Sequence, residues 1–108
     1  MGIAASLNRT TIEVNLMKAL KRSEAQEMLA DLDGWEIHGK ILAKDYAFKD
    51  FHDGLDFVKK VAAVADKQDH HPDVMLSYGS VVLELTTHSA GRLTDKDFKL
   101  AAAIDKLA

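Results

Sequence analysis

Three histidines stand out as candidates for proton transfer: the adjacent His70 and His71, and the later His88. An imidazole has an ordinary pKa of about 6.5, so it can both give and take a proton at neutral pH. Three such rings around one pocket would suit a reaction in which a hydroxyl leaves as water while a ring N–H loses its proton. That reaction transfers no electrons, so it needs no redox cofactor.

Pro72 limits how the histidine pair can be presented. A proline disfavours the helical region for the residue before it, so a helix that precedes His71 must have ended by that point. An extended backbone then directs His70 and His71 to different walls of one pocket. His88 lies just past the end of a predicted strand, where a loop can bring it towards the same pocket.

Two other interpretations of the histidines remain open. They could be surface or turn residues with no joint role. Three imidazoles could also hold zinc. However, adjacent histidines before a proline chelate poorly, and no two histidines are spaced four residues apart on a predicted helix. We therefore expect no metal site.

The first half of the chain predicts one helix and one hairpin. Ser23 and Gln26 form a capping-box pattern that begins a helix, and Gly34 offers the left-handed residue that ends such helices. Residues 35–37 and 41–48 are predicted to form two strands joined by a tight turn.

The second half predicts a helix, a second hairpin and a last helix. Asp50 can cap a helix whose apolar pattern fades at residues 67–69. Strands are expected at residues 74–77 and 81–87, because their side chains alternate between apolar and more polar positions. Thr94 can then cap the last helix.

This order, α-β-β-α-β-β-α, favours a single α+β domain. We expect a four-stranded antiparallel sheet with three helices packed on one face, spanning residues 21–108. Residues 1–20 precede it as an N-terminal extension of uncertain structure. A four-stranded sheet leaves two edges, and a second copy of the chain is the most economical cover, so we expect a homodimer or homotetramer.

The composition excludes several classes of function. The 108 residues carry a formal net charge of -3, which argues against a sequence-independent grip on nucleic acid. The chain has no cysteine, so disulfides, thiolate metal sites and cysteine nucleophiles are excluded. No apolar stretch approaches the roughly 20 residues that cross a bilayer, and the N-terminus is a poor signal peptide. We expect a cytoplasmic protein that does not bind membranes.

The spacing of the polar and aromatic residues resembles that of one enzyme family, the pterin-4a-carbinolamine dehydratases. The residues that match in type and separation are Asp66, His70-His71-Pro72, Tyr78, His88 and Asp97. Further segments resemble the family in the same order: Leu32-Asp33-Gly34-Trp35, Phe48-Lys49-Asp50-Phe51, Phe57-Val58-Lys59-Lys60-Val61-Ala62 and Leu85-Thr86-Thr87-His88. The resemblance covers about residues 23–108.

The resemblance implies a hydro-lyase that needs no cofactor. Its reaction would be the dehydration of 4a-hydroxytetrahydrobiopterin to quinonoid dihydrobiopterin, within tetrahydrobiopterin recycling. It leaves open a functional link to an aromatic amino-acid hydroxylase. The physiological pterin is not specified by the sequence.

The resemblance also implies roles for the matching residues. His70 and His88 would act as general acid and base groups, and His71 would help to hold and polarise the pterin. Asp97 would lie in the same site, where it could set the orientation of a histidine. Because Asp97 follows Thr94 by three residues, it also fits a helix cap, and both roles remain open.

Three further positions are supporting residues by this resemblance. Asp66 occupies the family's acidic position, and Trp35 and Tyr78 occupy its aromatic ones. Trp35 and Tyr78 also fit packing roles, and Asp66 also fits a solvated surface charge.

Two rival functions remain. Some members of the family bind and stabilise the dimer of a homeodomain transcription factor, which would make this chain an interaction module. Alternatively, the same pocket could serve a pterin-binding protein that supports molybdopterin metabolism. The complete set of three histidines favours the enzyme, because a pure binding module has no use for it.

Overall fold

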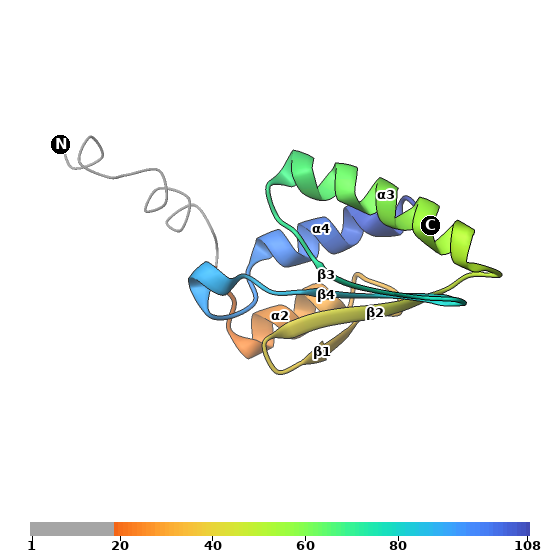
Figure 1. The fold of residues 1–108 in the computed structure, drawn as a ribbon. Helices are drawn as coiled ribbons and strands as arrows, with labels where there is room; N and C mark the ends of the chain where they lie inside the picture. Colours follow the sequence, from red (N-terminus) through yellow and green to blue (C-terminus); the bar gives the residue numbers. More distant parts are fainter. Residues whose placement is uncertain (1–18) are drawn as a thin grey trace, which may run out of the picture.

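A computed structural model of the chain describes residues 19–108, and its elements follow the predicted order (Figure 1). They are α2 (Arg22–Leu29), β1 (Glu36–His38), β2 (Ile41–Ala47), α3 (Phe51–Gln68), β3 (Asp73–Ser77), β4 (Ser80–Leu85), the 3-10 helix η2 (His88–Ala90) and α4 (Asp95–Asp105). Residues 1–18 of the predicted N-terminal extension lie outside the described part. Within residues 19–108, no helix has the length and apolar character to cross a membrane.

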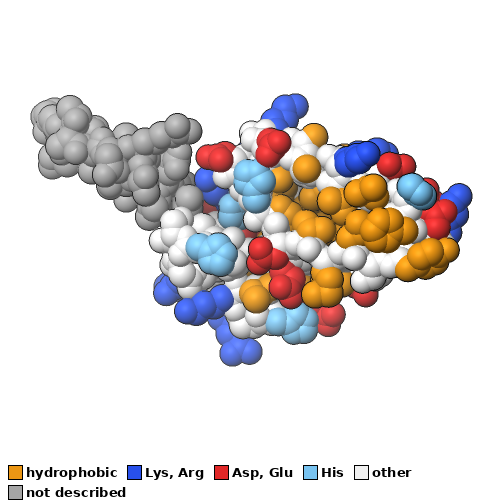
Figure 2. All heavy atoms as spheres, viewed as in Figure 1, with side chains coloured by type: hydrophobic (Ala, Val, Ile, Leu, Met, Phe, Trp, Pro, Cys, Tyr) orange, Lys and Arg blue, Asp and Glu red, His pale blue; other side chains and the backbone are white. Residues whose placement is uncertain are grey.

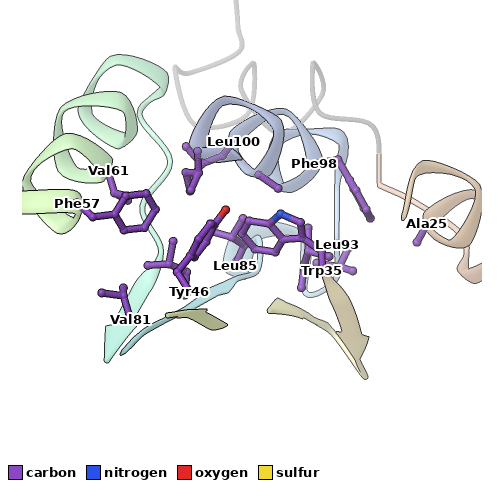
Figure 3. Packing of buried hydrophobic residues seen from close by; sticks show 14 of the residues in the cluster. Ala25, Trp35, Tyr46, Phe57, Val61, Val81, Leu85, Leu93, Phe98 and Leu100 are labelled. Atoms are coloured by element: carbon purple, nitrogen blue, oxygen red, sulfur yellow. The ribbon is translucent and has the colours of Figure 1, made fainter. Parts of the chain in front are cut away.

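The four strands form one antiparallel sheet in the order β1-β2-β4-β3. Each hairpin pairs its own two strands, and the central β2–β4 ladder joins the hairpins from Leu42↔Leu85 to Ala47↔Ser80. β1 and β3 are therefore the edges. The three helices pack on one face of the sheet, as the sequence predicts (Figure 3).

The core lies between that face and the helices (Figure 3). Val81, Leu83 and Leu85 of β4 are completely buried, because alternate residues of a strand point to the same face. Leu100 and Ile104 of α4 are buried against them.

Two of the predicted helix caps form as expected. Asp50 accepts a hydrogen bond from the Asp53 amide at 2.9 Å, which begins α3. The Thr94 hydroxyl accepts from the Lys96 amide at 3.2 Å, which begins α4.

The start and end of α2 differ from the prediction. The helix begins at Arg22 with Lys21 at its N-cap, and Ser23 lies inside it. The reason is that the Glu24 carboxylate reaches back and accepts from the Lys21 amide at 3.0 Å, so the N-cap lies two residues earlier than predicted. Gly34 is left-handed, with φ +80°, but the helix has already ended at Leu29.

A second polar cluster ties the C-terminal end of α4 to the sheet. Asp105 accepts from Trp35 Nε1 at 3.0 Å, from Lys44 Nζ at 3.0 Å and from the Tyr46 hydroxyl. Burial raises the pKa of Tyr46, and the hydrogen bond to Asp105 and the charge of that carboxylate raise it further. The phenol therefore stays protonated and remains a donor.

Candidate active site

The three histidines line one cavity of about 340 Å³, at the end of the sheet where α3 stops and α4 begins. Its lining comes from three segments of the chain: Asp69, His70, His71, Thr86, Thr87, His88, Ser89 and Lys96. The loop after β4 forms the short helix η2, which the sequence did not predict, and His88 is its first residue.

The end of α3 sets the direction of the first two histidines. Asp69 follows the helix in the left-handed conformation, with φ +50°, and is the only described residue other than glycine with a positive φ. This turn stops the helix, and β3 begins at Asp73, just after Pro72. His70 and His71 consequently turn to carboxylates on different elements.

His70 is bonded to a buried aspartate of α4. Its Nε2 lies 2.6 Å from Asp97 Oδ1, and the two side chains are 10% and 0% exposed. The other oxygen, Oδ2, accepts from the Thr87 hydroxyl at 2.7 Å and from the Thr94 amide at 3.0 Å. Both carboxylate oxygens are thus used, one for the helix cap and one for the histidine. Since Nε2 is engaged, Nδ1 is the nitrogen of His70 left for a ligand.

Thr87 and Thr94 extend this network in the buried layer. Their hydroxyl oxygens lie 2.8 Å apart, and Thr94 donates to Thr87 because the Thr87 hydroxyl already donates its hydrogen to Asp97. Sequence reasoning gave Thr87 no role. The only signal for it was its position directly before His88.

His71 has a weaker, more exposed partner. Its Nε2 lies 2.8 Å from Asp66 Oδ1, and the two side chains are 56% and 76% exposed. Asp66 belongs to the last turn of α3. A pair so open to solvent contributes little stability, so its significance lies in the orientation of the ring.

His88 completes the set as an exposed ring without a hydrogen-bond partner among residues 19–108. The cavity therefore combines one imidazole held by a buried carboxylate, one held by an exposed carboxylate and one that is unconstrained. In the same part of the chain, no three His, Asp or Glu side chains are arranged to hold a metal ion.

The structure does not bring the two aromatic candidates to this cavity. Trp35 is buried in the core, where its indole N–H bonds to Asp105. Tyr78 is 71% exposed in the turn between β3 and β4, at the end of β3 opposite the histidines. Within one protomer, both lie apart from the candidate site.

Comparison with known proteins gives consistent results. A family model described as pterin 4 alpha carbinolamine dehydratase matches residues 18–107. A protein of Sulfolobus acidocaldarius, provisionally named pterin-4-alpha-carbinolamine dehydratase, is 43% identical over 88 residues, covering 82% of this chain and 97% of its own. One from Saccharolobus islandicus with the same provisional name is 51% identical over 77 residues, covering 69% of this chain and 78% of its own.

Two solved structures share the fold. The crystal structure of a transcriptional coactivator/pterin dehydratase from Brucella melitensis superposes with a TM-score of 0.80 at 34% identity, covering 84% of this chain and 99% of that one. A pterin dehydratase-like protein, identified as a RuBisCO assembly factor in the alpha-carboxysome, gives a TM-score of 0.56 at 23% identity, covering 68% of this chain and 86% of that one. The latter is similar in fold alone.

Proposed function

The chain belongs to the pterin-4a-carbinolamine dehydratase family, and from that membership we propose that it dehydrates 4a-hydroxytetrahydrobiopterin to quinonoid dihydrobiopterin. The observation that supports this most is the gathering of three imidazoles around one cavity, with a buried carboxylate behind one of them. The reaction would stand in tetrahydrobiopterin recycling, downstream of an enzyme that hydroxylates the pterin at C4a.

The chemistry requires two proton transfers that balance. The bond from C4a to the hydroxyl oxygen breaks, and that oxygen takes a proton from one imidazole and leaves as water. The proton on N5 passes to another imidazole, and its electron pair forms the C4a–N5 double bond. We assign the acid and base roles to His70 and His88, and we assign the holding and polarising of the ring to His71.

Asp97 acts in this scheme as a positioning residue. Its Oδ1 fixes the ring of His70 and favours the tautomer that carries the proton on Nε2. When His70 takes a second proton on Nδ1, the nearby carboxylate stabilises the resulting imidazolium. Asp66 would hold His71 in a similar but weaker way.

Direct measurement of turnover tests the proposal. We expect the purified protein to accelerate formation of quinonoid dihydropterin from freshly generated 4a-carbinolamine, well above the uncatalysed rate. A parallel assay with molybdopterin intermediates tests the alternative that the pocket acts on a related pterin ring. If the protein acts on those intermediates and not on the carbinolamine, the dehydratase proposal is wrong.

We also propose that the chain forms a homodimer through the β3 edge. β3 is an edge strand, and among the described residues two of the large apolar side chains most open to solvent, Met75 and Tyr78, lie on it or just after it, 65% and 71% exposed. An edge strand that carries exposed apolar side chains invites pairing with another strand. Figure 2 shows hydrophobic side chains gathered over β3 and α3, next to this edge. If β3 pairs with β3 of a second copy in antiparallel fashion, a two-fold axis lets the unpaired backbone groups of each edge bond to the other.

Met75→Glu tests that pairing. Met75 is the central residue of Asp73–Ser77, so a two-fold axis near the middle of β3 places it close to its own copy. Two like charges there oppose association. We expect sedimentation velocity to show the variant as an 11.9 kDa monomer. Ala47→Glu is the matched control, because Ala47 is exposed on the same face of the sheet but on the interior strand β2. If Met75→Glu and Ala47→Glu sediment with the same mass, the charge at β3 has no specific effect on association, and the β3 edge is not the interface.

A second candidate function is partner binding, which the Brucella melitensis structure favours through its description as a transcriptional coactivator. A variant without the catalytic histidines distinguishes the two roles. Binding to a transcription factor would survive the loss of turnover, because it would use the outer surface of the oligomer.

A further inference from the structure

A second cavity, of about 450 Å³, lies between the start of α2, the β1–β2 turn and the loop that follows η2. Its described lining contains four cations and no carboxylate, although the chain as a whole has a net charge of -3. The cations are Lys21, Arg22, Lys40 and Arg92. None of them forms an ion pair with a carboxylate of residues 19–108.

This basic cavity borders the histidine cavity. Thr86 lines the histidine cavity, and its hydroxyl donates to the backbone carbonyl of Lys40 at 2.6 Å. Thr87 also lines the histidine cavity, and it pairs with Arg92 in a β-bridge. The two cavities therefore lie on either side of the Thr86–Lys40 and Thr87–Arg92 contacts, so a ligand that occupies both must extend across these contacts. Figure 2 shows Lys and Arg side chains below a histidine at the end of the molecule where η2 lies in Figure 1.

We propose that the enzyme takes a pterin whose C6 side chain carries a phosphate group, with the ring among the histidines and the phosphate among these four cations. The proposal rests on the dehydratase function and names its substrate class. A phosphate monoester presents three oxygens, and guanidinium groups bind such oxygens with paired charge-assisted hydrogen bonds. A neutral dihydroxypropyl side chain offers no charge to these four exposed cations.

The inference predicts a preference that depends on Lys40 and Arg92. We expect the wild type to dehydrate a phosphorylated tetrahydropterin carbinolamine with a KM at least about tenfold below that of the unphosphorylated compound, as charge-assisted bonds to phosphate imply. In the double variant Lys40→Gln/Arg92→Gln, the ratio of the two kcat/KM values should fall towards one. Raising the salt concentration should weaken the preference of the wild type in the same direction.

The matched control is Lys59→Gln/Lys60→Gln. It removes two exposed cations from α3, outside both cavities, so the preference should stay as in the wild type. This control separates a local phosphate site from a general effect of net charge. Thermal unfolding of both double variants verifies that each is folded.

Binding measurements distinguish failure of this inference from failure of the dehydratase proposal. Calorimetry with a phosphorylated dihydropterin, its unphosphorylated form and inorganic phosphate needs no turnover. If no carbinolamine is turned over but the phosphorylated pterin binds tighter in a manner that needs Lys40 and Arg92, the phosphate site stands and the enzyme assignment falls. If both pterins bind and react alike, or inorganic phosphate alone accounts for the binding, the inference is overturned.

Discussion

His70→Gln is expected to lower kcat for pterin dehydration by roughly 10²–10⁴-fold, which is the usual contribution of a positioned general acid or base. Glutamine can still donate to Asp97 Oδ1 from its side-chain amide, so the buried carboxylate keeps a partner and the fold is retained. What it cannot do is exchange a proton with the substrate. Steady-state kinetics on the carbinolamine measures the effect, and replacing His70 and His71 together with alanine should abolish turnover.

His38→Gln is the control for that experiment. His38 is an exposed histidine on β1 that does not line the cavity, so its loss should leave kcat as in the wild type. If the double alanine variant of His70 and His71 kept full turnover, the proposed mechanism would be wrong.

The second large effect is expected from Asp97→Asn. The substitution preserves volume, but the side-chain amide now presents a donor to Nε2 and so favours the tautomer of His70 with its proton on Nδ1. We expect kcat to fall by roughly 10²-fold or more, because the ring then has the wrong nitrogen available as a base.

Comparing Asp97→Ala with Asp97→Asn separates the two roles of Asp97, which are to position His70 and to cap α4. Asp97→Ala also leaves the Thr87 hydroxyl and the Thr94 amide without their acceptor in a buried layer, so we expect unfolding in urea to show a loss of about 3–5 kcal/mol. Asp97→Asn keeps an acceptor for both groups and should cost clearly less. If Asp97→Asn keeps wild-type kcat, Asp97 is a helix cap and has no role in positioning His70.

The fold could be predicted because its signals are local. Asp50 and Thr94 are caps whose side chains bond to amides two or three residues away, and period-two alternation specifies which face of β4 is buried. The start of α2 was missed because Ser23 and Glu24 offer competing caps within one turn. Sequence patterns rank Ser23 higher, but the carboxylate of Glu24 reaches the Lys21 amide.

The sequence predicted that His70, His71 and His88 would line one cavity, but not the contacts that these side chains make. The bond between His70 and Asp97 joins residues 27 apart, and it depends on how α4 packs against the end of α3. The left-handed turn at Asp69 could not be predicted, because the residue there is not a glycine. The helix η2 is too short to produce a recognisable periodicity in the sequence. Trp35 and Tyr78 were grouped with the site because resemblance gives spacing and residue type, whereas burial and the direction of β3 place them elsewhere.

A carboxylate near each end of α4 bonds to side chains of other elements, so the position of the helix links the two sets of contacts. Asp97 holds His70 at one end, and Asp105 holds Trp35, Lys44 and Tyr46 at the other, about 12 Å away at the rise of an α-helix. A helix of this length tilts as a rigid body. Loosening the Asp105 contacts would therefore shift His70 relative to the other imidazoles without replacing any histidine, so the proposed proton exchange would depend on contacts about 12 Å from Asp97.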